Sequence, residues 1–480
     1  MLVNCIFFFL IIGIIISFVT STNTKKVSLF VSGSTLILTS LLLINFNLNK
    51  YEFQQFGSSL NLNQTISISG YFLVDGLSIF FIFLTTLLVF LCILSIFNNT
   101  RFKLYSLLLL IIELFLMIIF TTQNLFVFYV FFEAILIPMF LIVGVGGSRE
   151  RKIRATYLFF FYTFVSSALM LLTIIFIYNN YKTLNIQELF RISFQNENYI
   201  QIILTLPFIL CFASKMPMFP FHIWLPEAHV EAPTVGSVLL AGILLKLGVY
   251  GFIRFCLPVF PEGSLFYAPL IYLFSVIGII STSLIAIRQT DLKRIIAYSS
   301  VAHMNLVTLG LFSFNINGIE GAIVQSISHG FVAGGMFFLI GMIYDRYHSR
   351  LIYYYGGLTH SMPICSIVFL IFTISNIALP GTSSFVGEFL ILIGIYKCNT
   401  TVCIFSATGV ILCGAYSLWV YNRTSFGNVK TESLITFQDL LLREFVIVCP
   451  LILAIIIIGL FPNYILNTIH LSANVIPILT

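Results

Sequence analysis

Long apolar segments separated by short polar ones dominate the hydrophobic pattern of this chain. A segment of about 20 apolar residues is long enough to cross a bilayer as an α-helix. The pattern predicts an all-α polytopic membrane protein with about 14 transmembrane helices. The expected spans cover residues 2–20, 27–45, 72–98, 104–120, 124–144, 155–178, 200–224, 234–256, 264–287, 293–313, 319–344, 364–396, 402–422 and 440–462. Residues 2–20 lack the basic segment and cleavage site of a signal peptide, so we expect a retained first span.

Two of the expected spans contain prolines that interrupt a helix. The seventh has Pro217 and Pro220 directly after Lys215, and the twelfth has Pro380 ahead of Glu388. These spans are five apart, and an odd offset places equivalent helices in opposite orientations. The sequence therefore predicts two inverted five-helix repeats, spans 4–8 and 9–13, each with a broken helix. Corresponding broken helices are the best sequence pointer to the ion site of a transporter.

The repeats define the expected organisation of the chain. Residues 1–103 form spans one to three, 104–256 the first repeat, 264–422 the second repeat, and 423–480 the last span and a tail. Sixteen basic residues lie in or beside the loops after odd-numbered spans, and five lie in or beside the loops after even-numbered spans. Because Lys and Arg gather on one side of a membrane, we expect both termini on the opposite side.

The composition excludes a soluble protein. Hydrophobic residues make up 59% of the chain and charged residues 8%, with a mean hydropathy of +1.07. A soluble domain has about a quarter of its residues charged. The nine cysteines are scattered, mostly within apolar segments, and form no C-x-x-C pair. We therefore expect no zinc, no iron–sulfur cluster and no disulfide framework.

Seven ionisable residues fall within seven different expected spans. A charge at the centre of a bilayer costs about 2.5–3.5 kcal/mol by insertion scales, and such residues nearly always face a bundle interior or a hydrated cavity. Acids, amines and imidazoles in a row, with pKa values tuned by their surroundings, are what a proton relay requires. The candidates for proton translocation are Glu113, Glu133, Lys215, Lys246, His303, His329 and Glu388.

Each candidate also has a structural interpretation. Glu133 and Lys215 are expected to stabilise each other as a buried pair, which serves either a proton switch or helix packing alone. Lys246 is surrounded by apolar residues for about two turns on each side, so that snorkelling to an interface is difficult. His303 and His329 lie beside serines that can hold bridging water, although a buried histidine is more often a satisfied core residue.

The remaining ionisable residues are less distinctive. Glu388 lies a turn or two past the predicted break, whereas Glu113 can equally cap or pair structurally. His222 and His229 are seven residues apart across Pro226 and lack the i, i+4 spacing of a helical metal site. We therefore expect a hydrated rim in this loop instead of a metal site.

Three segments resemble the signature of a known family. They are 214–229 (SKMPMFPFHIWLPEAH), 291–300 (DLKRIIAYSS) and 379–389 (LPGTSSFVGEF). They are similar to the antiporter-like subunits of the proton-pumping NADH:quinone oxidoreductase, complex I, and the resemblance covers about residues 110–460. The same fold occurs in multisubunit sodium/proton antiporters. Of the three antiporter-like subunits of complex I, subunits 2 and 5 have a lysine at the twelfth-span position, and Glu388 is typical of the third.

The resemblance implies a role for each matched residue. Glu133 and Lys215 are the implied coupling pair, Lys246 and the two histidines a central relay, and Glu388 the terminal group. The resemblance also implies that NADH, FMN, the iron–sulfur clusters and ubiquinone belong to other subunits, so that this chain has no cofactor of its own. The implied partners are other membrane-arm subunits, including subunits 2 and 5, together with lipids and protons, and not nucleic acid. The implied location is the mitochondrial inner membrane.

Two other interpretations remain open. A subunit of a sodium/proton antiporter would have a similar core and would transport sodium independently of NADH oxidation. A purely structural subunit would use its buried charges only to hold helices together, so that replacing them would prevent assembly without changing activity.

Overall fold

The computed structural model describes residues 2–20, 23–47, 54, 72–147, 150–191, 198–428 and 438–473. Among these residues, β pairing is limited to four isolated bridges, and eleven helices are long and apolar enough to cross a membrane. The predicted all-α polytopic fold is therefore confirmed. The eleven are α1 (Leu2–Val19), α2 (Thr24–Ile44), α3 (Ser78–Ser95), α4 (Phe102–Thr121), Leu125–Gly146, α7 (Lys152–Tyr181), Thr234–Val259, α14 (Pro261–Arg288), α16 (Ile316–Tyr347), α20 (Thr400–Ser425) and α21 (Leu442–Leu460).

The predicted count of about 14 spans is not confirmed, and three spans account for the difference. The seventh and twelfth are broken, which leaves the short helices α9 (Asn198–Lys215), α18 (Pro363–Asn376) and α19 (Ser383–Cys398). The tenth, α15 (Leu292–Leu311), is long enough, but buried serine, histidine, asparagine and threonine residues lower its hydropathy. All three exceptions are thus polar or interrupted helices.

The chain forms two compact units. Of the described residues, those within 2–215, 250–266 and 467–473 form unit 1, and those within 216–249 and 267–466 form unit 2. The predicted division into two inverted repeats stays a prediction. The shorter helices are α5 (Leu125–Ala134), α6 (Leu136–Gly146), α8 (Ile186–Arg191), α10 (Trp224–Glu231), α11 (Thr234–Leu239), η2 (Leu240–Leu244), α12 (Leu245–Gly251), η3 (Phe252–Cys256), α13 (Leu257–Val259), η4 (Ile352–Tyr354), α17 (Leu358–Ser361) and α22 (Asn463–Ala473).

Two further spans are interrupted where no break was predicted. The fifth divides into α5 and α6 at Ile135. Pro138 explains the position, because it has no N–H to donate to the carbonyl of Ala134, four residues earlier. The eighth contains two π-helical turns, η2 and η3, which no proline or glycine pattern in the sequence predicts. Broken backbone is thus more common among these helices than the proline pattern of spans seven and twelve indicated.

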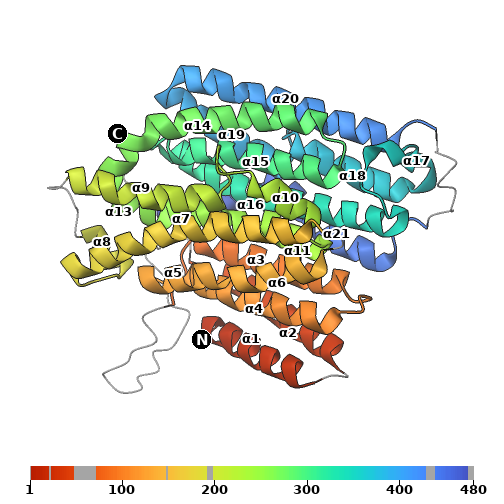
Figure 1. Ribbon diagram of the computed structural model, residues 1–480, viewed down its shortest axis with the longest axis horizontal. Coiled ribbons are helices and arrows are strands. Elements are labelled where there is room, and N and C mark those ends of the chain that lie inside the picture. The colour runs from red at the N-terminus through yellow and green to blue at the C-terminus, as the bar shows by residue number, and fades with distance from the viewer. Residues whose placement is uncertain are drawn as a thin grey trace. The chain divides into compact units, whose positions relative to one another are not determined.

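In unit 1, α2 packs against α1 and α3, and α7 packs against α9. The close approach of α1 to α2 requires a glycine, since a Cβ at Gly13 would lie 2.5 Å from a methyl group of Val31. The lower part of Figure 1 shows α1, α2, α3 and α4 side by side. The core between these helices is largely apolar and contains a few buried hydroxyl groups and Glu113.

In unit 2, α16 is the central helix and packs against α15, α18, α19 and α21 (Figure 1). It is buried from Gly318 to Ile343. Glycines allow the tightest crossing, because a Cβ at Gly321 of α16 would lie 2.7 Å from the backbone nitrogen of Ile391 of α19. The ionisable residues of α15, α16 and α19 are therefore held by closely packed helices.

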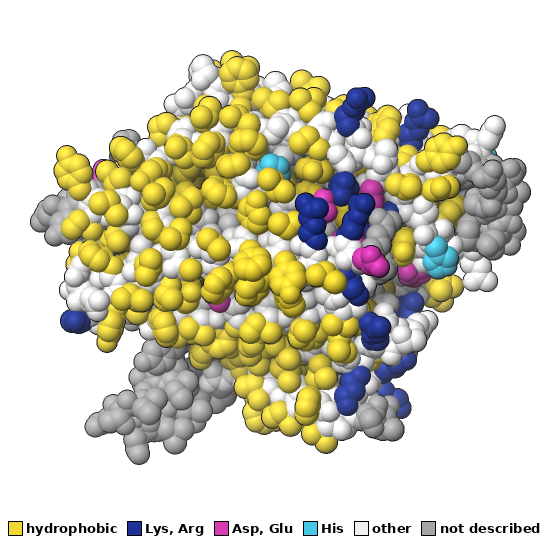
Figure 2. All heavy atoms as spheres, in the orientation of Figure 1, with side chains coloured by type: hydrophobic (Ala, Val, Ile, Leu, Met, Phe, Trp, Pro, Cys, Tyr) yellow, Lys and Arg dark blue, Asp and Glu magenta, His cyan; other side chains and the backbone are white. Residues whose placement is uncertain are grey.

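The surface agrees with a membrane location. Many large hydrophobic side chains are exposed along the helices, for example Phe161, Leu172 and Ile411. Most of the Lys and Arg side chains on the visible face gather near one end of the helices, with one at the opposite end, and the rest of that face is mainly hydrophobic (Figure 2). This is the distribution expected for helices that cross a bilayer with one basic side.

Candidate functional site

Four of the seven predicted residues form a buried row in unit 2. Lys246 Nζ lies 2.8 Å from Nδ1 of His329, and the ring centroids of His329 and His303 are 5.7 Å apart. Nδ1 of His303 lies 2.9 Å from Oε1 of Glu388. The four side chains come from α12, α16, α15 and α19, and none is more than 6% exposed. The structure thus joins residues far apart in the sequence into a series of ionisable groups.

A π-helical turn positions Lys246. The turn η2 directly precedes α12, and Lys246 Nζ donates a hydrogen bond to the carbonyl of Ala241, five residues earlier. An ammonium group has three donor hydrogens, so this bond leaves others free to reach His329. Single π-helical turns within α-helices are frequent at functional sites. The carbonyl of Ala241 is a partner that the sequence did not reveal.

Glu388 is held at the other end of the row by two side chains. Besides its contact with His303, Oε1 of Glu388 accepts a hydrogen bond of 3.0 Å from Nε2 of Gln325. Gln325 is 1% exposed on α16 and was missed at the level of sequence. A glutamine in the middle of an apolar helix is the signal that could have identified it, because a buried amide needs partners.

The break before Glu388 exposes backbone and hydroxyl groups inside the unit. Between α18 and α19, Ala378 and Gly381 have positive φ angles of 61° and 91°. Ser383, at the start of α19, shares a hydrogen bond of 2.7 Å with Ser328 of α16, next to His329. The interrupted helix therefore supplies polar groups beside the row, as predicted for a broken span.

Glu133 and Lys215 lie near each other in unit 1, as predicted, but they do not form a direct ion pair. Their charges interact electrostatically, while Oε1 of Glu133 and Nζ of Lys215 have no hydrogen-bond partner among the described residues. Lys215 Nζ instead lies 4.5 Å from the ring centroid of Phe132, a cation–π contact. Lys215 is 2% exposed. An unsatisfied buried amine facing an acid is an arrangement in which either group can change its protonation.

Glu113 is completely buried among the N-terminal helices of unit 1. Its Oε1 accepts a hydrogen bond of 2.8 Å from Thr35 of α2, and its Oε2 has no partner among the described residues. Thr35 belongs to a buried hydroxyl stripe on α2 that also contains Ser28, Ser32 and Thr39. No hydrogen bond or ion pair among the described residues joins Glu113 to Glu133 or Lys215, and its role in proton translocation stays a prediction.

The loop after the seventh span differs from the expected hydrated rim. His229 is fully buried on α10 and stacks on Phe337 with 4.7 Å between ring centroids. Neither ring nitrogen of His229 has a hydrogen-bond partner among the described residues. His229 does not belong to a hydrated rim, because α10 packs against α15 and keeps this histidine from the surface. No three His, Cys, Asp or Glu residues lie together as a metal site in the described part of the chain.

The comparisons with known proteins identify the family. Residues 122–413 match the model described as NADH:quinone oxidoreductase/Mrp antiporter, TM. The chain belongs to this family of membrane proteins. Within the family it is of the chain 4 type. It is 49% identical over 452 residues to NADH-ubiquinone oxidoreductase chain 4 of Marchantia polymorpha, and the match covers 94% of this chain and 91% of that protein. It is 46% identical over 418 residues to NADH-quinone oxidoreductase subunit M of Rhodobacter capsulatus, covering 84% and 81% of the two chains.

Solved structures share the fold. A chain of respiratory complex I from Thermus thermophilus matches with a TM-score of 0.87 and 29% identity, covering 99% of both chains. A chain of the Mrp complex from Dietzia sp. matches with a TM-score of 0.86 and 18% identity, covering 99% and 98% of the two chains. The second likeness shows the fold alone.

Proposed function

We propose that this chain is a core membrane-arm subunit of NADH:ubiquinone oxidoreductase that translocates protons across the mitochondrial inner membrane. Electron transfer from NADH to ubiquinone takes place in other subunits and drives this translocation. The observation that supports it best is the row from Lys246 to Glu388. Buried titratable groups in a membrane protein line ion pathways, and here four of them follow one another between adjacent helices.

Proton transfer along the row needs no group outside these side chains and water. Lys246 gives a proton to Nδ1 of His329, at 2.8 Å, and the imidazole releases its other proton from Nε2. The ring centroids of His329 and His303 are 5.7 Å apart. The proton crosses this gap through one bridging water, or directly after one of the rings has rotated. His303 then gives a proton from Nδ1 to Glu388, at 2.9 Å. The original charges return when Lys246 takes up a proton from water and Glu388 releases one to water. The two imidazoles have then exchanged their protonated nitrogen, and a ring rotation or a second transfer through water restores the starting tautomers.

The pair formed by Glu133 and Lys215 is the proposed coupling element. A change in neighbouring subunits alters the distance between the two groups and with it the charge of Lys215. Charges a few ångströms apart interact by several kcal/mol at a low effective dielectric constant. Such an interaction is large enough to change the protonation of Lys215 itself. The proposal follows from the electrostatic contact of the two residues and from their unsatisfied atoms.

The remaining expectations belong to the same proposal. The chain has no redox centre of its own, and NADH, FMN, the iron–sulfur clusters and ubiquinone bind elsewhere in the complex. Its proposed neighbours are the antiporter-like subunits 2 and 5, with lipids around the exposed apolar helices. The exposed side chains that favour these contacts include Phe161 and Ile411.

The test uses the complete complex reconstituted in sealed vesicles. Glu388→Gln keeps the shape and the hydrogen-bonding capacity of the side chain but removes the acid. We expect NADH-driven proton translocation to fall about tenfold or more, since a general acid–base group contributes that much or more to a proton-transfer rate. The matched control is Glu227→Gln, which removes a carboxylate that pairs with Arg294 at 2.9 Å, partly exposed and away from the row. A Glu388→Gln complex that assembles and pumps like the control would contradict the proposal.

Two further measurements separate the alternatives. Sodium flux independent of NADH oxidation would favour an antiporter subunit. Normal pumping stoichiometry in an assembled Lys215→Ala complex would exclude the coupling role of Lys215 while leaving the row in unit 2 untouched. The structural interpretation would be supported if every charge replacement reduced assembly while each assembled complex kept its normal activity.

A further inference from the structure

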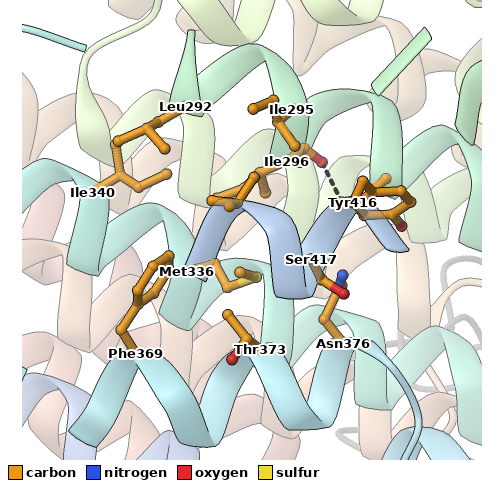
Figure 3. Close-up of a pocket in the computed structure, with 12 residues that line it drawn as sticks. Leu292, Ile295, Ile296, Met336, Ile340, Phe369, Thr373, Asn376, Tyr416 and Ser417 are labelled. Carbon is orange, nitrogen blue, oxygen red and sulfur yellow. Dashed lines mark hydrogen bonds between the residues drawn. The ribbon is translucent and has the colours of Figure 1, made fainter. Parts of the chain in front are cut away.

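Two small cavities in unit 2 meet at one side chain, Tyr416. The first, with a volume of about 10 Å³, lies between α15, α16, α18 and α20 and is drawn in Figure 3. The second, with a volume of about 20 Å³, is lined by His303, Glu388 and Cys413. Tyr416 belongs to the lining of both. A volume of about 10–15 Å³ holds one water molecule, so each cavity is of the size that a single water requires.

Polar atoms gather where the two cavities meet. The hydroxyl of Tyr416 donates a hydrogen bond of 2.9 Å to Sγ of Cys413, and this sulfur lies 3.7 Å from Nε2 of His303. The Cys413 thiol also lies 3.2 Å from the carbonyl oxygen of Asn376. Figure 3 shows Asn376 and Ser417 beside one another, near Tyr416. A buried phenol therefore stands between the imidazole of the row and a group of amide and hydroxyl side chains.

The far end of the first cavity approaches the basic side of the unit. Leu292 and Ile340 line that end, away from Tyr416 (Figure 3). Leu292 is the first residue of α15, next to Lys293 and Arg294. The walls between the two ends are largely apolar, with Ile295, Met336 and Phe369 among them. An apolar constriction admits water only intermittently and so limits leakage of ions.

We propose that Tyr416 is a proton-relay residue that connects the His303–Glu388 pair with the basic side of the membrane through the first cavity. This proposal rests on the proposed function. The phenol gives its proton to a water in the second cavity, beside His303, and accepts a proton from a water in the first cavity. It is neutral before and after the step, and a rotation of the hydroxyl hydrogen restores the starting arrangement. One proton enters and one leaves, with no other bond changed.

The alternative is that Tyr416 is an ordinary core residue, whose hydroxyl makes a hydrogen bond but transfers no proton. Buried Tyr hydroxyl groups usually find a hydrogen-bond partner, and a thiol is a weak one. The side chain of Asn376 also hydrogen-bonds to this hydroxyl. Asn376 lines the first cavity and Cys413 lines the second, so the hydroxyl has a partner at each cavity. The position between the cavities, not the burial alone, distinguishes the relay from a core residue.

The test compares two tyrosines of the same helix in the complete complex. Tyr416→Phe removes the hydroxyl of the relay. Tyr421→Phe makes the same chemical change at a buried residue of α20 that packs against Phe369 and Phe426 and borders neither cavity. We expect Tyr416→Phe to lower NADH-driven proton translocation about tenfold or more and to change the solvent isotope effect on turnover. Tyr421→Phe should leave both unchanged, with similar assembly for the two variants.

Glu388→Gln in the same assay separates the two levels of the proposal. If Glu388→Gln abolishes pumping and Tyr416→Phe behaves like Tyr421→Phe, the relay role of Tyr416 is wrong and the row remains. If Glu388→Gln pumps normally, the proposed function itself is wrong. Should Tyr416→Phe fail to assemble, the solvent isotope effect of Tyr416→Trp decides, because an indole N–H donates but cannot accept and so cannot relay a proton. A value equal to wild type overturns the relay.

Discussion

Replacing Gly387 by alanine tests whether the row depends on the close packing of α16 and α19. A Cβ at this position would lie 2.7 Å from the backbone nitrogen and Cα of Gln325, whereas ordinary contacts begin at 3.4 Å. Backbone atoms of a packed helix cannot rotate away, so α19 has to move by about 0.7 Å. Overpacking of this kind typically costs about 1–3 kcal/mol of stability.

The displacement changes the position of Glu388, because this proton-transfer group directly follows Gly387 in the chain. A movement of α19 away from α16 by that amount also shifts Glu388, and a distance of 2.9 Å to His303 can become about 3.6 Å. A hydrogen bond at that length no longer positions a proton for transfer. Misplacement by about 1 Å can lower a rate about 100-fold, so we expect pumping to fall about 10- to 100-fold.

The assay is NADH-driven proton uptake by the reconstituted complex, with assembly measured separately by native electrophoresis. Gly414→Ala is the matched control, because its Cβ would find a side-chain carbon of Ile377 at 3.9 Å, an ordinary contact. That substitution should be neutral or stabilise α20 by about 0.5–1 kcal/mol. Gly387→Ala with normal assembly and normal pumping would refute the reasoning, since the row would then tolerate a displaced Glu388.

Three further predictions concern the surrounding structure. Asp75→Asn should destabilise unit 1 by about 3–5 kcal/mol, measured as a lower melting temperature in detergent, because Arg254 lies 2.5 Å from that carboxylate and both side chains are largely buried. Glu113→Gln should leave the proton-to-electron ratio unchanged, because the amide oxygen still accepts from Thr35; a lower ratio in vesicles would place Glu113 on a proton path. Arg346→Lys should lower the melting temperature of unit 2 by the equivalent of about 1 kcal/mol, since one ammonium cannot replace the two hydrogen bonds, of 3.1 and 2.7 Å, to Glu444.

The sequence predicts the helices better than their interruptions. Apolar length identifies the regular spans, and the prolines after Lys215 and before Glu388 correctly indicate the two broken ones. The division of the fifth span at Ile135 follows from Pro138, but one proline inside an apolar run often only kinks a helix. The π-helical turn before Lys246 has no comparable signal, because no proline marks it and its carbonyl at Ala241 bonds to a side chain five residues later.

The candidate site was predicted as a list of residues, and the structure supplies their order. Hydropathy shows that a charged residue is unusual in a span, but it contains no distance between spans. The contact of Lys246 with His329 and of His303 with Glu388 arises only when α12, α15, α16 and α19 pack together. Gln325 and Tyr416 were overlooked because a neutral polar side chain lowers the hydropathy of a long span only slightly.

Interrupted backbone explains how the chain tolerates these groups in an apolar interior. Glu133 precedes the end of α5 by one residue, Lys215 ends α9, Lys246 follows a π-helical turn, and Glu388 follows the break before α19. At each place carbonyl or N–H groups are released from the regular helix and offer partial charges nearby. Lys215 also lies in the last turn of its helix, where the dipole favours a cation by about 0.3–1 kcal/mol. Glu133 and Lys215, which have no strong ion pair, can gain or lose a proton at smaller cost than a group fixed in one. This is the physical reason to expect that restoring a regular helix, by Pro138→Ala beside Glu133, would slow coupled pumping even though no ionisable residue is removed.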